Sequence, residues 1–184
     1  MVLVQGKSFE VRSDEILGKV KMAAEIRKNL FKVQAEGNAA LKKIPDKIVI
    51  SNGDMDCKNV LWADGKPHIV DLECLIYCNP YTELYQLALC WSGCEHQAIN
   101  FGLITTFIKS YIQEYGEIKV DWKTLYYTND RLWWLEHNVK KALMIDCKSE
   151  LERDAGIEQV KEAMKYTIYY DSIKEDLLRE LRGL

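Results

Sequence analysis

The chain has 184 residues, of which 25 are Lys or Arg and 28 are Asp or Glu, and its net charge is -3. These charges are spread along the whole length, so there is no basic face of the kind that duplex nucleic acid requires, and we expect no nucleic-acid partner. Because 48% of the residues are hydrophobic, we expect one compact domain over residues 1–184. No apolar run approaches the roughly 20 residues that span a bilayer, and the opening MVLVQGKSFEV lacks the pattern of a signal peptide. We therefore expect a cytoplasmic protein with no membrane partner.

The first predicted element is an amphipathic helix that begins near Ser13. Ser13 is a good N-cap, acidic residues follow it in the first turn, and Gly37-Asn38 offers a stop. A small β region comes next, because the short β-branched runs KIVIS, NVLWA and HIVDL are typical of strands. Asp64-Gly65 supplies a turn between the last two runs.

Helical patterns dominate the chain after Asn79-Pro80. We predict helices near residues 81–92, 95–115, 121–147, 150–168 and 171–182. The charged stretch over residues 148–182 is typical of the solvated face of two terminal helices. The predicted fold class is therefore mainly α (α+β), with a small central set of β-hairpins.

Three polar residues around the β region have the types and the order that phosphoryl transfer needs. Asp54 and Asn59 form a D-x4-N spacing in a loop between two predicted strands, and Asp71 follows at the end of the next strand. Phosphoryl transfer uses a carboxylate to hold or deprotonate the attacking hydroxyl, and hard oxygen ligands for Mg²⁺. Asp54 suits the first task and Asn59 and Asp71 suit the second. Taken separately, each is also a common turn or capping residue.

The segment SNGDMDCKNVLW-ADGKPHIVDLE resembles the catalytic and metal-binding loops of the aminoglycoside phosphotransferase and choline kinase group, whose pattern is H-x-D-x4-N followed by a strand ending in D-[WFL]-E. The downstream NPYTEL resembles the stretch that opens the family's next helix, and the close match covers residues 48–84. The resemblance implies the helical C-terminal lobe of the protein-kinase-like fold. It also implies transfer of the γ-phosphate of ATP or GTP to a hydroxyl of a small molecule such as an aminoglycoside, choline or a sugar.

Carried over residue by residue, the resemblance makes Asp54 the catalytic base and Asn59 and Asp71 the ligands of Mg²⁺. It makes Glu73 an acid that assists the metal or its bound water. Asp56 and Lys58, inside the loop, are second-rank contacts to acceptor or phosphate, and solvated loop charges are the favoured interpretation.

The sequence departs from the family in two respects. Asn52 stands where the family has His, a residue that mainly supports the backbone of the loop. The residues before the catalytic loop show no Gly-rich loop and no strand of the V-A-I-K sort, so we expect a C-terminal lobe without the nucleotide-covering lobe. Either the chain is part of a longer kinase, or it is a shortened, non-catalytic binding module that contacts a partner or itself through the vacated apolar surface.

Two further groups of residues have a functional and a structural interpretation. The C-x3-C pairs Cys74/Cys78 and Cys90/Cys94 supply four thiols for zinc, but buried, reduced thiols are favoured in a cytosolic protein. Asp130 lies in an aromatic stretch whose rings and carboxylates suit a cationic acceptor, although packing in the core is favoured for the rings. The members of this stretch are Trp122, Tyr126, Tyr127, Trp133, Trp134 and the carboxylates of Asp130 and Glu136.

Overall fold

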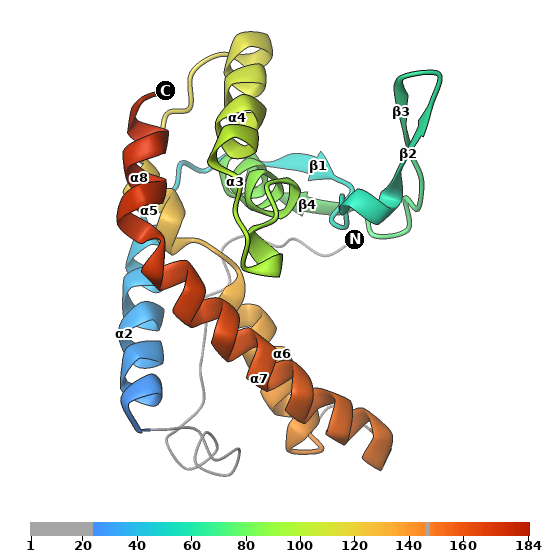
Figure 1. The fold of residues 1–184 in the computed structure, drawn as a ribbon, viewed down its shortest axis with the longest axis vertical. Coiled ribbons are helices and arrows are strands. Elements are labelled where there is room, and N and C mark those ends of the chain that lie inside the picture. The colour runs from blue at the N-terminus through green and yellow to red at the C-terminus, as the bar shows by residue number, and fades with distance from the viewer. Residues whose placement is uncertain (1–23, 146–147) are drawn as a thin grey trace.

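The computed structural model describes residues 24–145 and 148–184, and it is mostly helical with two small antiparallel sheets (Figure 1). This confirms the mainly α class. The helices are α2 (Ala24–Leu41), α3 (Pro80–Trp91), α4 (Phe101–Tyr115), α5 (Trp122–Tyr127), α6 (Arg131–Ala142), α7 (Glu150–Ser172) and α8 (Lys174–Arg182). The strands are β1 (Val49–Ser51), β2 (Val60–Ala63), β3 (Lys66–Ile69) and β4 (Ile76–Cys78). None of the described helices combines the length and the apolar character needed to cross a membrane.

The β region lies where the sequence predicts it. β2 and β3 form a hairpin whose turn residues, Asp64 and Gly65, both have positive φ, as a tight two-residue turn requires. β1 pairs with β4, so the β2–β3 hairpin is inserted in the chain between the two strands of this second sheet. The predicted strand over residues 68–72 is wrong in its second half, because β3 ends at Ile69 and Asp71 turns the chain with a φ of 61°.

The predicted boundaries of α2 and α4 are each wrong at one end, and the helix start predicted near Ser13 lies outside the described residues. α2 runs through Gly37-Asn38 to Leu41, because Ala40 at its end is buried and tertiary packing outweighs the weak stop signal. The helix predicted over residues 95–115 begins only at Phe101, since Gly93 and Gln97 adopt left-handed conformations around a short 3-10 turn (η2, Cys94–His96).

The long helix predicted over residues 121–147 is divided into α5 and α6. Thr128 ends α5 by donating its hydroxyl to the carbonyl of Leu125 (2.8 Å), and the Asn129 side chain accepts from the amide of Arg131 (3.0 Å) at the start of α6. The break leaves Asp130 in a loop rather than on a helix face.

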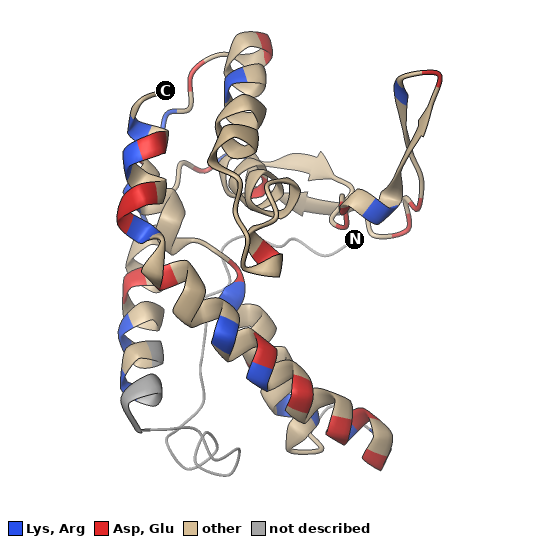
Figure 2. Ribbon diagram, in the orientation of Figure 1, with Lys and Arg blue, Asp and Glu red and all other residues tan. Residues whose placement is uncertain are grey.

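The terminal charged stretch forms α7 and α8 as predicted, although α7 extends to Ser172. Ser149 caps α7 by accepting from the amide of Glu152 (3.2 Å). Acidic and basic residues alternate along α7 (Figure 2), with pairs such as Lys161–Glu158 (2.6 Å) on its exposed face.

The core consists of two clusters. The larger packs α3 against α4, α5 and α8, with Tyr85 and Tyr170 at its centre, joined through their hydroxyls (2.6 Å). The smaller packs α6 and α7 against α2. Arg131 lies between the clusters, only 1% exposed, with its guanidinium 3.1 Å from Asp171 and 4.5 Å from the ring centre of Tyr170.

Candidate functional site

Asp54 and Asn59 lie in contact in the loop between β1 and β2. The Asn59 side-chain amide donates to the Asp54 carbonyl (2.7 Å) and to its carboxylate (3.0 Å). Asn59 is buried, whereas Asp54 is half-buried and reaches the solvent. Lys58 places its ammonium 3.4 Å from the same Asp54 carboxylate oxygen, and this contact raises the pKa of Lys58. The structure thus brings together two of the residues predicted from the D-x4-N spacing.

Several contacts fix this loop on the helical body. The Trp91 indole of α3 donates to the carbonyl of Met55 (2.9 Å), and the Ser51 hydroxyl donates to the Glu83 carboxylate. Gly53 adopts a φ of 75°, and a Cβ at this position would collide with the carbonyl oxygen of Cys74. Only glycine lets the loop pass so close to the neighbouring chain.

Asp71 and Glu73 lie exposed in the segment between β3 and β4. The amide of Val70 donates to the carbonyl of Asn59 (2.9 Å), so the chain just before Asp71 is tied to the end of the loop. The negative charge of Asp71 contributes to the raised pKa of Lys58, which places Asp71 within electrostatic range of the loop. Among the described residues, however, Asp71 and Glu73 do not join Asp54 in a close-packed group of three metal-ligating side chains.

Asn52, at the position of the family's His, is 5% exposed. Neither polar atom of its side chain has a hydrogen-bond partner within the described part of the chain. A buried amide without partners costs free energy rather than supporting the loop. Within the described residues, the Asn52 side chain therefore adds no hydrogen bond that would hold the loop.

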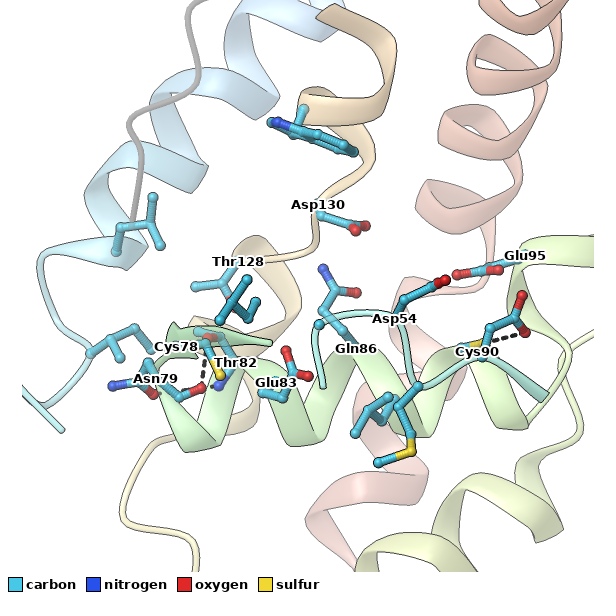
Figure 3. Close-up of a pocket in the computed structure, with 18 of the residues that line it drawn as sticks. Asp54, Cys78, Asn79, Thr82, Glu83, Gln86, Cys90, Glu95, Thr128 and Asp130 are labelled. Atoms are coloured by element: carbon cyan, nitrogen blue, oxygen red, sulfur yellow. Dashed lines mark hydrogen bonds between the residues drawn. The ribbon is translucent and has the colours of Figure 1, made fainter. Parts of the chain in front are cut away.

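A cavity of about 810 Å³ opens beside the loop, between the loop, α3 and the α5–α6 connection (Figure 3). Asp54 lines it, whereas Asn59, Asp71 and Glu73 do not. None of the described residues that line the cavity is Lys or Arg. Six acidic residues line it, namely Asp46, Asp54, Asp56, Glu83, Glu95 and Asp130. The cavity is therefore strongly acidic.

The acids of the cavity raise one another's pKa. Desolvation, followed by the charge of Glu95, raises the pKa of Asp130 to about 6. The Asp130 side chain is nevertheless exposed to solvent at the cavity, so water moderates this shift. Desolvation, and then the charge of Asp56, also raise the pKa of Glu95. A cation in the cavity would relieve both effects.

The sequence did not single out Glu83, Gln86 or Glu95 as site residues. A signal was present for α3, because Glu83, Gln86 and Cys90 are spaced three and four residues apart and thus share one helix face, which Figure 3 shows turned toward the cavity. No such spacing marks Glu95, which reaches the cavity from η2.

The aromatic stretch divides between core and surface. Tyr126 is fully buried and Trp122 and Tyr127 pack against the same cluster, so the core interpretation is confirmed for these three. Trp133 and Trp134 are 46% and 39% exposed, and Trp133 lines the cavity, where its ring stacks on His137 (5.4 Å). Glu136 pairs with Lys140 (3.0 Å) on α6.

The cysteines of the two C-x3-C pairs do not converge on one point in the described part of the chain. Cys78 and Cys94 are buried, as the favoured interpretation predicts, whereas Cys74 is exposed and Cys90 is partly exposed. The only close group of three or more His, Cys, Asp or Glu side chains among the described residues is Asp56, Cys57 and Cys90. Cys147 lies outside the described residues.

No family matches the chain, and no curated protein or solved structure matches it either. The functional argument therefore depends on the residues of the site and their geometry.

Proposed function

We propose that the chain is the catalytic lobe of a small-molecule kinase similar to the aminoglycoside phosphotransferases, which transfers the γ-phosphate of ATP or GTP to a hydroxyl of a cationic acceptor. The single observation that carries the proposal is the Asp54–Asn59 contact at the edge of an acidic cavity. The D-x4-N spacing supports the roles and the cavity supports the acceptor class.

In this proposal each part of the site has one task. Asp54 accepts the proton of the attacking hydroxyl, and the Asn59 amide holds its carboxylate in place through the 3.0 Å hydrogen bond. Mg²⁺ would be held by the oxygens of Asn59, Asp71 and Glu73, which are the hard ligands that this ion prefers, and it would neutralise the phosphates. Binding it requires the exposed segment after β3 to fold toward the loop.

The acceptor is proposed to be an amino sugar or a quaternary amine. A lining of six acids, with no Lys or Arg among the described lining residues, attracts cations and repels anions. Trp133 also lines the cavity, and an indole ring is a group over which a cation can bind. A neutral sugar would gain neither contact.

The metal arm is tested by following thermal unfolding while Mg²⁺ and nucleotide are added. We expect stabilisation of the parent chain and its loss in Asp71→Asn. The matched control is Asp64→Asn, because Asp64 is likewise an exposed Asp with positive φ but belongs to the β2–β3 turn. No stabilisation of the parent, or equal stabilisation of both variants, would contradict the metal site.

The acceptor arm is tested by calorimetric titration with a polyamine amino sugar and with a neutral sugar of similar size. We expect only the amino sugar to bind, with weaker binding to Glu95→Gln and unchanged binding to Glu114→Gln, an exposed substitution on α4 away from the cavity. Equal binding of both sugars would count against a cation-selective cavity.

A second candidate function is a non-catalytic interaction module, and the exposed apolar residues of the β region favour it. Ile50, Leu61 and Trp62 are 61%, 56% and 64% exposed. The hairpin that carries Leu61 and Trp62 extends away from the helical body (Figure 1). Five more large apolar residues between positions 48 and 75 are also exposed: Ile48, Val49, Ile69, Leu72 and Leu75. Such a surface is typical of a protein interface.

Light scattering over a range of concentrations tests this candidate. Self-association that is lost in Leu61→Ser but kept in Leu151→Ser would support it, because Leu151 is a more exposed leucine on α7, away from the β region. Self-association that is equal in both variants, or phosphate transfer by the chain to an amino sugar, would contradict it.

A further inference from the structure

Asp56, Cys57 and Cys90 bring a carboxylate and two thiols together beside the cavity, which Asp56 and Cys90 line. The ligand atoms of the three side chains lie within 4.8 Å of one another. Asp56 and Cys57 belong to the loop between β1 and β2, whereas Cys90 comes from the last turn of α3. The group therefore joins two elements that are more than 30 residues apart in sequence.

The geometry is close to that of a tetrahedral thiolate site. Zn²⁺ with Zn–S bonds of about 2.3 Å and Zn–O bonds of about 2.0 Å holds its ligand atoms roughly 3.5 to 3.8 Å apart. The Cys90 thiol already lies 3.7 Å from the Asp56 carboxylate. Cys57 is exposed, so a rotation of its side chain can close the remaining distance without disturbing the core.

The electrostatic surroundings favour a cation at this point. The carboxylate of Asp56 lies 3.7 Å from the Cys90 thiol, and the negative charges of Asp56 and Glu95 both act on it. Glu95 also lines the cavity beside Cys90 and feels the charge of Asp56, so a second carboxylate is close to the group. The one nearby cation in the loop, Lys58, lies 3.8 Å from Asp56 but is shared with Asp54. A divalent ion would compensate this negative charge and hold both thiols as thiolates.

We propose that Asp56, Cys57 and Cys90 form a binding site for a thiophilic divalent cation such as Zn²⁺, with Glu95 or water as the fourth ligand. Two sulfur ligands select such an ion over Mg²⁺, which prefers oxygen ligands. The site is distinct from the proposed Mg²⁺ ligands Asn59, Asp71 and Glu73, and it does not depend on the kinase proposal.

Metal binding here has a structural consequence for the loop. Trp91 already ties the loop to α3 through the carbonyl of Met55 (2.9 Å), and the metal adds a second tie one residue further along the loop. The metal would also take the charge of Asp56 away from Lys58, which would then pair with Asp54 alone. Occupancy of this site would thus change the pairing of Lys58 with Asp54.

The test is titration of the full chain with Co²⁺. The chain is kept reduced by a phosphine, and the thiolate-to-cobalt charge-transfer absorption is recorded. We expect a band that saturates at one ion per chain and disappears when Zn²⁺ is added. Removing even an outer-sphere partner of a metal ligand costs about 10- to 100-fold in metal affinity. Cys57 and Cys90 would bind the metal directly, so we expect at least tenfold weaker binding in Cys57→Ser and Cys90→Ser. The matched control Cys74→Ser removes an exposed thiol outside the group and should bind as the parent does.

Two results would overturn the proposal. One is the absence of a charge-transfer band in the parent chain, and the other is a band in Cys57→Ser as strong as that of the parent. Cys57 is exposed, so its replacement keeps the test valid even if Cys90→Ser disturbs the packing of α3. The readout involves neither nucleotide nor acceptor, so its failure is separable from failure of the proposed kinase function.

Discussion

Replacement of Asn59 by Ala should destabilise the protein by removing hydrogen bonds within the loop between β1 and β2. The substitution removes two hydrogen bonds, at 2.7 and 3.0 Å, that the buried amide donates to Asp54. Each is worth about 0.5–1.5 kcal/mol net, and the half-buried Asp54 can recover part of this by contact with water, which gives a loss of about 2 kcal/mol. For a chain of this length such a loss lowers the melting temperature by roughly 4–8 °C.

Thermal unfolding by circular dichroism measures this loss. The matched control is Gln113→Ala, because Gln113 is an exposed amide on α4 and its loss should change the free energy of unfolding by less than about 0.5 kcal/mol. Asn59→Asp tests the same contact further. This substitution removes the amide donor and places a second carboxylate beside Asp54, so the two negative charges repel each other. If Asn59→Ala has the same melting temperature as Gln113→Ala and the parent, Asn59 does not hold Asp54 and the reasoning is refuted.

Three further predictions concern positions around the site and the core. Gly53→Ala should destabilise the protein by about 1–3 kcal/mol, because the φ of 75° disfavours a side chain and the added Cβ would collide with the Cys74 carbonyl. Urea unfolding measures this loss, and an unchanged midpoint would contradict it. Because the folded pKa of Asp130 is raised to about 6, above its unfolded value, parent stability should fall as pH rises from about 4 to 6. Asp130→Asn should remove that fall, gaining about 1 kcal/mol or less at pH 7 and nothing at pH 4; equal gains at both would refute the cause. Arg131→Met should lower the free energy of unfolding by about 1–3 kcal/mol, measured by chemical unfolding, because it leaves the Asp171 carboxylate without its buried partner. Arg153→Met, on the exposed face of α7, should change it little, and equal losses in the two variants would contradict this.

The β region and its loop could be predicted from the sequence because their signals are local. Short β-branched runs, the Asp64-Gly65 turn and the D-x4-N spacing all lie within residues 47–72, and the structure places a hairpin there with Asp54 beside Asn59. The change from strands to helices after Asn79-Pro80 was also visible in the sequence. The structure begins α3 at Pro80, where the Asn79 side chain accepts from the amide of Tyr81 (3.0 Å).

The acidic cavity could not be predicted, because its acids come from segments far apart in sequence. Its formation depends on the two helix breaks that periodicity alone missed. The left-handed residues Gly93 and Gln97 create the short turn that carries Glu95, and the break after Thr128 releases Asp130 from a helix face. Both breaks follow from backbone conformation and side-chain capping, which a search for 3.6-residue periodicity does not detect.

The measurement that tests the central claim most directly is transfer of labelled γ-phosphate from ATP or GTP to a polyamine amino sugar, with Mg²⁺ present. The account predicts transfer by the parent chain and by Asp64→Asn, and loss of transfer in Asp54→Asn, which keeps the size of the side chain but cannot accept the proton of the hydroxyl. An absence of transfer by the parent chain, or transfer by Asp54→Asn equal to that of the parent, would contradict it.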